Sequence, residues 1–212
     1  MKLYDYCRSS AAYRLRIALN LKGINYEHYS VNLLEGKQSS DEYKQINPQG
    51  LVPSLEDNGH TLNQSLAILE YLEEAYPDTV SLLPESLSER ARVRSLALSI
   101  ACDVHPLNNL RVLKYLVGQL DATEEQKLEW YAHWITEGFT ALETELARSE
   151  FTGKFCHGDT PTFADLCLVP QVFNAKRFNV PMDAYPNINR IMENCEALEA
   201  FTKAHPANQP DS

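Results

Sequence analysis

The sequence predicts an α/β domain followed by an all-helical domain, and three observations lead to this prediction. Strand and helix patterns alternate over the first eighty of the 212 residues. A segment rich in proline, serine and acidic residues follows at 77–88 and reads as a linker, and only helical patterns come after it. We therefore expect a first domain over residues 1–80 and an all-helical second domain over residues 88–212.

The first domain begins with a short apolar strand, Lys2–Tyr6, and an amphipathic helix, Ala11–Lys22, which Gly23 ends. Tyr26–Leu33 is expected to form a second strand. A polar segment without a clear pattern then runs through residues 35–50.

A hairpin and a helix complete the predicted βαβ and ββα order. Val52–Glu56 and His60–Leu62 flank Asn58-Gly59, which is a strong hairpin signal because both turn positions require a positive φ. From Ser65 onward, apolar residues recur at helical spacing.

The second half shows helical patterns only. One helix is expected to start near Val93 and to continue through His105-Pro106, where the proline should kink it. A long helix is expected between Leu128 and Leu146. Thr162 and Asp165 form a capping box in front of the next helix, and shorter helices close the chain.

Composition excludes several classes of function. The net charge of −10 disfavours nucleic acid and anionic membranes as partners, so a small anionic ligand would need a local arginine. No segment is apolar and long enough to span a membrane. Five scattered cysteines without a CxxC pair, and six histidines without ligand spacing, argue against disulfides and a metal site. We expect a cytoplasmic protein that binds no metal.

Arg8-Ser9-Ser10 is the most informative motif because it stands between the first strand and the first helix. The unpaired N–H groups and the dipole of a helix N-terminus attract an anion, and a serine hydroxyl there can stabilise a thiolate. Simple capping of the helix by serine is the alternative explanation. Further along this helix, Arg14 and Arg16 are expected to be structural, because side chains beyond the first turn point away from its N-terminus.

The motifs together resemble the cytosolic glutathione transferases over almost the full length, with zeta-class members, the maleylacetoacetate and maleylpyruvate isomerases, most similar. They are Arg8-Ser9-Ser10, Asn47-Pro48-Gln49, Val52-Pro53, Gln64-Ser65, His105–Asn109, Gly158-Asp159-Thr160, Ala164–Val172 and Gln209-Pro210-Asp211. The resemblance implies a thioredoxin-like first domain, an all-helical second domain, glutathione as cofactor and a homodimer.

The resemblance also implies site residues. Ser9, with Ser10 and Arg8, would act in catalysis, and Arg8 and Arg177 would hold the two carboxylates of a maleyl substrate. Val52-Pro53 is similar to a bend with a cis proline, at which the Val52 backbone stays free for the peptide backbone of glutathione. The implied glutathione-binding residues are Ser9, Gln38, Gln49, Val52, Gln64, Ser65, His105, Asn109 and Arg111.

The implied reaction is cis-trans isomerisation, in which a thiolate adds to the double bond of a maleyl compound, allows rotation and leaves again. Two departures from the zeta pattern, Ala11 and Tyr13, stand where cysteine and tryptophan are common, and they weaken a broad transferase function more than an isomerase function. Maleylacetoacetate is the favoured substrate. Maleylpyruvate, a general transferase and a non-catalytic interaction module are the alternatives.

Overall fold

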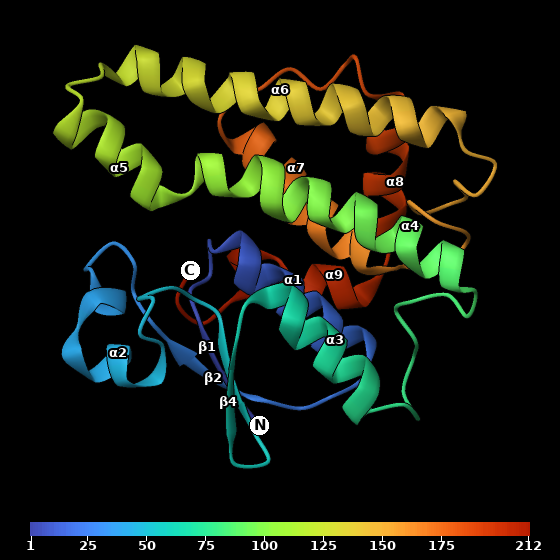
Figure 1. Ribbon diagram of the computed structural model, residues 1–212, viewed down its shortest axis with the longest axis horizontal. Helices are drawn as coiled ribbons and strands as arrows, with labels where there is room; N and C mark the ends of the chain where they lie inside the picture. Colours follow the sequence, from blue (N-terminus) through green and yellow to red (C-terminus); the bar gives the residue numbers. More distant parts are fainter. The chain divides into compact units, whose positions relative to one another are not determined.

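The computed structural model describes residues 1–212, which divide into two compact units. Unit 1 combines Met1–Leu83 with Glu196–Ser212, and unit 2 comprises Pro84–Cys195. Figure 1 shows a sheet with helices in unit 1 and helices alone in unit 2. The chain therefore forms the α/β and all-helical parts that the sequence predicts, and its last segment packs with the first of them.

Unit 1 contains a four-stranded mixed sheet with the order β2-β1-β3-β4. The strands are β1 (Lys2–Asp5), β2 (Glu27–Ser30), β3 (Ser54–Asp57) and β4 (His60–Asn63). β1 pairs in parallel with β2 and antiparallel with β3, and Leu3 lies opposite both His28 and Leu55. The β3–β4 turn has a positive φ at Asn58 and Gly59, which confirms the hairpin prediction.

Helix α1 (Ser10–Leu21) is buried along most of its length because α3 (Ser65–Ala75) and α9 (Glu199–Ala204) both pack against it. At the end of α1, Lys22 forms a buried ion pair with Glu73 of α3 at 2.6 Å. The same ammonium donates to the carbonyl of Val80 at 2.9 Å. These bonds satisfy a buried cation and connect α1, α3 and the end of the first segment of unit 1.

The buried guanidinium of Arg16 connects α1 to β1. Its Nη1 lies 2.7 and 2.8 Å from the two carboxylate oxygens of Asp5, and both side chains are fully buried. Its Nε donates to the carbonyl of Ala204 at 2.9 Å and its Nη2 to that of Cys7 at 2.8 Å. Because every contact of Arg16 is internal, its geometry agrees with a structural role.

Unit 2 consists of consecutive helices. They are α4 (Leu87–Leu98), the π-helix η2 (Ser99–Val104), the 3₁₀-helix η3 (His105–Asn108), α5 (Leu110–Gln119), α6 (Glu124–Arg148), α7 (Phe163–Arg177) and α8 (Pro186–Glu196). Most of α7 is buried, and it packs against α4 and η2. No helix is both long and apolar enough to cross a membrane.

The predicted capping box at the start of α7 is confirmed. The fully buried carboxylate of Asp165 accepts from the Thr162 N–H at 2.7 Å and from the Thr162 hydroxyl at 3.0 Å. Its other oxygen accepts from the Cys156 N–H at 2.8 Å. Asp165 therefore fixes both the start of α7 and the preceding loop.

The structure differs from the sequence predictions at three places. The helix that starts near residue 87 does not merely kink at Pro106: the α-helix ends at Leu98, and the chain continues through the π-helix η2 and the 3₁₀-helix η3. Pro106 lies in η3, where it has no N–H for an α-helical hydrogen bond. The polar segment before the hairpin contains two elements that the sequence did not predict, η1 (Lys37–Ser39) and α2 (Asp41–Ile46). Strand β2 is also shorter than predicted.

Candidate functional site

Ser9 stands at the N-cap of α1, directly after β1. Its Oγ accepts a hydrogen bond from the Ala12 N–H at 3.3 Å, and its own N–H donates to the Tyr6 carbonyl at 2.8 Å. A hydroxyl has one donor and two acceptor sites, so this capping contact leaves the Ser9 O–H able to donate. Capping and anion stabilisation are thus compatible in the same side chain.

The neighbours of Ser9 differ in exposure. Ser10 is buried in the first turn of α1, whereas Arg8 is exposed, with its guanidinium carbon 5.9 Å from the centroid of the Tyr6 ring. Cys7 is buried, and burial raises the pKa of its thiol, with the nearby Asp211 charge acting in the same direction. The raised pKa favours the neutral thiol at Cys7. Cys7 is therefore a different kind of group from Ser9, whose hydroxyl can stabilise an anion at this helix N-terminus.

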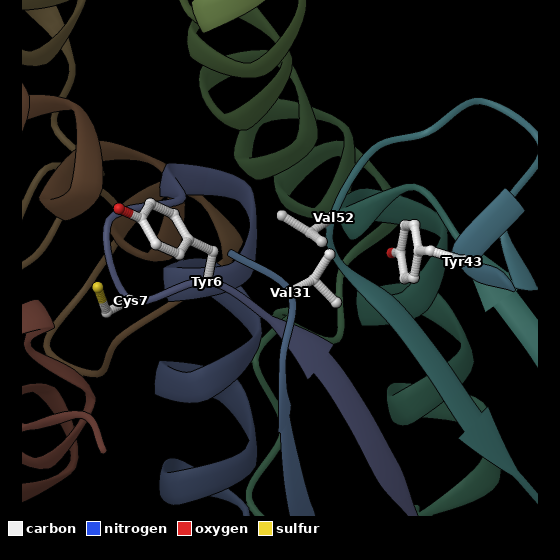
Figure 2. Packing of buried hydrophobic residues seen from close by; sticks show 5 residues of the cluster. All are labelled: Tyr6, Cys7, Val31, Tyr43 and Val52. Atoms are coloured by element: carbon white, nitrogen blue, oxygen red, sulfur yellow. The ribbon is translucent and has the colours of Figure 1, made fainter. Parts of the chain in front are cut away.

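The Val52-Pro53 peptide bond is cis. Figure 2 shows Val52 beside Val31 in an apolar cluster that also holds Tyr6, Cys7 and Tyr43. Neither the N–H nor the C=O of Val52 forms a hydrogen bond within the chain. An unpaired donor and acceptor on one residue can pair with an extended peptide, as a strand edge does.

Gln64 and Ser65 lie where α3 begins. Gln64 is the N-cap residue of α3 and has a φ of 72°. Residues other than glycine rarely adopt this backbone conformation, and those that do are concentrated at functional sites. Gln64 Nε2 donates to Gln49 Oε1 at 2.9 Å, so two predicted site residues are in direct contact. The Ser65 Oγ accepts from the buried Arg14 guanidinium at 3.1 Å.

Arg14 is a residue whose position the sequence reasoning missed. Its guanidinium lies against Ser65, where it adds positive charge at the N-terminus of α3, an end that already favours a carboxylate. Arg14 lies beyond the first turn of α1, but its side chain is long enough to reach Ser65 on the neighbouring helix. No sequence signal connects residues 14 and 65.

Gln38 lies in η1, next to the loop that leads to Val52. Its side-chain oxygen is buried and accepts no hydrogen bond within the chain. Its backbone oxygen would lie only 2.9 Å from a Cβ at position 50, where Gly50 has φ 63°. Glycine at this position therefore permits the close approach of the two loops, and Gln38 has an acceptor available for an N–H.

The predicted site residues of unit 2 lie in two segments, and Tyr131 of α6 contacts both of them. The Tyr131 carbonyl accepts from Asn108 of η3 at 3.4 Å, and its ring lies 4.0 Å from that of Phe178. The guanidinium of Arg177, which is exposed, stands 5.2 Å from the Phe178 ring. The end of α7 with Arg177 is thereby linked to the segment that contains His105.

The other two predicted residues lie at the start of α5. Asn109 is its N-cap, with its side-chain oxygen accepting from the Arg111 N–H at 3.1 Å. The Arg111 side chain is exposed. His105 is half-buried at the junction of η2 and η3, and π-helical segments of this kind occur frequently at functional sites. No group of three or more His, Cys, Asp or Glu side chains is arranged to hold a metal ion.

Family models match both parts of the chain. The N-terminal domain model of glutathione S-transferase matches residues 3–80, and the C-terminal domain model matches residues 129–194. The chain belongs to the glutathione S-transferase family.

Similar proteins cover the full length of this glutathione S-transferase. A probable maleylacetoacetate isomerase of Vibrio cholerae is 49% identical over 99% of this chain and 97% of its own. The structure of a bacterial zeta-class maleylpyruvate isomerase is 48% identical, covers 100% of both chains and has a TM-score of 0.98. The structure of a maleylacetoacetate isomerase from Methylobacterium extorquens, with bound malonate and glutathione, is 45% identical with a TM-score of 0.97 and covers 100% of this chain and 99% of that one.

The residues of unit 1 fit glutathione. This tripeptide needs a partner for its backbone, a site for its γ-glutamyl carboxylate and a donor for its sulfur. The Val52 backbone has a free donor and acceptor, the N-terminus of α3 with Ser65 and Arg14 suits a carboxylate, and Ser9 has a hydroxyl proton to donate. The buried Gln38 oxygen adds an acceptor that nothing in the chain uses.

Proposed function

We propose that this chain is a glutathione-dependent cis-trans isomerase that converts maleylacetoacetate to fumarylacetoacetate in the breakdown of tyrosine and phenylalanine. The observation that carries the proposal is the Ser9 hydroxyl, held at the N-terminus of α1 with its proton available, in a chain whose full-length relatives bear the names of such isomerases. Glutathione, when bound, supplies the thiolate that adds reversibly to the double bond.

In this proposal the chain lowers the pKa of the bound thiol. Ser9 donates its O–H toward the sulfur, and the unpaired N–H groups at the start of α1 favour negative charge at the same place. Ser10 lies in the first turn of α1, and Arg8 directly precedes Ser9. Both residues therefore lie at the positive end of the helix, where a developing enolate would be stabilised. The protein thus contributes a stabilised anion and an electrostatic environment.

The tripeptide would be held by residues from several elements. Val52 pairs with its backbone, Ser65 and Gln64 receive the γ-glutamyl carboxylate, and Gln38 and Gln49 contribute amide groups. The support for these roles is the free Val52 backbone, the orphaned Gln38 oxygen and the Gln49–Gln64 hydrogen bond. His105, Asn109 and Arg111 are the proposed contacts from unit 2, on the strength of the family resemblance.

The substrate is proposed to be a dianion held by Arg8 and Arg177. Both guanidiniums are exposed and planar, so each can bind a carboxylate with two hydrogen bonds. Maleylpyruvate is a second candidate because a full-length relative with a TM-score of 0.98 is a maleylpyruvate isomerase. The two substrates share the maleyl group and differ only in the chain beyond it.

The test is an ultraviolet assay of the purified protein on freshly generated maleylacetoacetate and maleylpyruvate, with and without glutathione. Glutathione-dependent formation of the fumaryl isomer is expected, with the larger kcat/KM for maleylacetoacetate. A larger kcat/KM for maleylpyruvate would assign the second reaction. No conversion of either compound, with turnover of halide or epoxide substrates, would replace the isomerase by a general transferase.

We further propose that the enzyme is a cytoplasmic homodimer. All five cysteines are free, and four of them are buried, which fits a reducing compartment. The homodimer follows from the family resemblance. Light scattering on the purified protein would show twice the mass of the chain, and a single-chain mass would contradict it.

A further inference from the structure

The C-terminal tail lies against the turn that carries Ser9. The Asp211 carboxylate accepts from the Cys7 N–H at 3.0 Å, and the Asp211 carbonyl accepts from the Cys7 thiol at 3.2 Å. In Figure 2 the Cys7 side chain points away from Val31 and Val52. One residue of the tail thus holds two separate groups of Cys7, across 204 positions of sequence.

Arg16 holds the same residue by a third group. Its Nη2 donates to the Cys7 carbonyl at 2.8 Å, and its Nη1 lies 3.5 Å from the Tyr6 carbonyl. All three hydrogen-bonding groups of Cys7, namely the N–H, the C=O and the thiol, therefore have fixed partners. Arg16 of α1 is itself held by Asp5 of β1. The bonds to the Cys7 N–H and thiol come instead from Asp211 of the tail.

The fixed residue belongs to the turn that ends at Ser9. The Ser9 N–H donates to the Tyr6 carbonyl at 2.8 Å, which closes a four-residue turn with Cys7 and Arg8 in its middle. In such a turn, rotation about the Cys7 backbone moves the residues that follow it. Holding Cys7 therefore holds the position from which the Ser9 hydroxyl extends.

The tail is rigid enough to act in this way. Gln209 is 8% exposed, and its Nε2 donates to the carbonyls of Lys203 at 2.8 Å and His205 at 3.0 Å. The 3₁₀-helix η4 (Pro206–Asn208) lies between these points. Asp211 thus follows an anchored segment that returns to α9, which packs on α1.

We propose that Asp211 is a positioning residue, which holds the Cys7–Arg8 turn so that the Ser9 hydroxyl points at the sulfur of bound glutathione. This inference rests on the proposed function. Asp211 touches neither substrate nor cofactor in the proposal and acts through the backbone of Cys7. Burial, and after it the Asp211 charge, raises the pKa of the Cys7 thiol, which donates to the Asp211 carbonyl.

The chain offers variants that separate positioning from charge. Asp211→Ala removes the carboxylate that accepts from the Cys7 N–H but keeps the backbone carbonyl that accepts from the thiol. Asp211→Asn keeps an oxygen for the Cys7 N–H but loses the charge, and an NH2 group replaces the second oxygen, which lies 3.8 Å from His28 Nε2. Ser30→Ala is the matched control, because the exposed Ser30 hydroxyl donates to the same Asp211 oxygen at 3.0 Å and forms no hydrogen bond with Cys7, Arg8 or Ser9.

The measurements are kcat, the KM for glutathione, and the pKa of the bound glutathione thiol from its ultraviolet thiolate absorbance. For Asp211→Ala we expect kcat to fall about tenfold and the thiol pKa to rise about one unit, with the KM for glutathione within about twofold. Asp211→Asn should stay within about threefold of wild type, and Ser30→Ala should equal wild type. Hydrogen exchange at the Ser9 amide should accelerate only in Asp211→Ala.

Each other result contradicts the proposal. An Asp211→Ala protein with unchanged thiol pKa and unchanged Ser9 exchange would show that Asp211 does not position the turn, even if its melting temperature fell. Equal losses in Asp211→Asn and Asp211→Ala would make the effect one of charge. A wild-type protein that binds no glutathione would refute the proposed function, while the Ser9 exchange rates would still decide the role of Asp211.

Discussion

Replacing Ser9 by alanine should reduce turnover strongly while leaving the protein folded. The structure lets the two effects be estimated separately. The capping bond from the Ala12 N–H to Ser9 Oγ is 3.3 Å long, at the weak end for such bonds, so losing it should cost about 0.5–1 kcal/mol of stability. A domain of this size tolerates that loss.

The loss in turnover should be larger because the hydroxyl would donate to a charged group. A hydrogen bond to a charged group contributes about 1.5–3 kcal/mol. At about 1.4 kcal/mol for each factor of ten, kcat should fall roughly 10- to 100-fold. Glutathione affinity should change little, because the Val52 backbone and Ser65 remain in place.

The assay is steady-state kinetics on maleylacetoacetate, with calorimetric titration of glutathione and a titration of the bound thiol. Ser9→Gly is the matched variant, since glycine at an N-cap costs only a few tenths of a kcal/mol but also lacks the hydroxyl. Both variants should lose the same activity despite different stabilities. Near-normal kcat in either folded variant would remove Ser9 from the proposed role.

Three further predictions concern His28, Asp165 and Arg177. The Asp5 carboxylate, 3.3 Å from His28 Nε2, raises the pKa of His28 against the effect of burial. Protonated His28 therefore contributes its full stabilisation of the folded protein below about pH 6.5, and this contribution is lost as the pH rises through the raised pKa of His28 in the folded state. Urea unfolding from about pH 6 to about pH 9 should show this decline in wild type and not in His28→Gln; parallel curves would contradict it. Asp165→Ala should cost about 2–4 kcal/mol in the same assay, because buried N–H groups of Cys156 and Thr162 lose their acceptor, and a loss below about 1 kcal/mol would contradict that reasoning. Arg177→Ala should raise the KM for the maleyl substrate roughly 10- to 100-fold with kcat little changed, and an unchanged KM would exclude it as a carboxylate anchor.

Local sequence signals predicted the parts of the fold that depend on neighbouring residues. The Asn58-Gly59 turn and the Thr162–Asp165 capping box are formed within a few residues, and both are confirmed. Helix α2 was missed because it is only six residues long and buries a single side chain, Tyr43, so it has no apolar periodicity. Its signal was the Ser40 cap, followed by acidic residues in the first turn.

The site required more than local signals. Ser9 and Gln64-Ser65 could be singled out because serine at a helix N-terminus has a recognisable chemistry. The contacts that support them, Arg14 with Ser65 and Asp211 with Cys7, join residues 51 and 204 positions apart and leave no pattern in a single sequence. The π-helix η2 and the 3₁₀-helix η3 lie at and before Pro106, which the sequence indicates only as an interruption of a helix.

The most direct test of the proposed isomerase is the geometry of the product that it forms. Proton NMR would monitor maleylacetoacetate with the wild-type protein in the presence of glutathione or of S-methylglutathione, which lacks a free thiol. Conversion to the trans isomer is expected with glutathione alone, without net consumption of glutathione. Conversion with S-methylglutathione, or accumulation of a stable glutathione adduct in place of the trans isomer, would contradict the proposed isomerase.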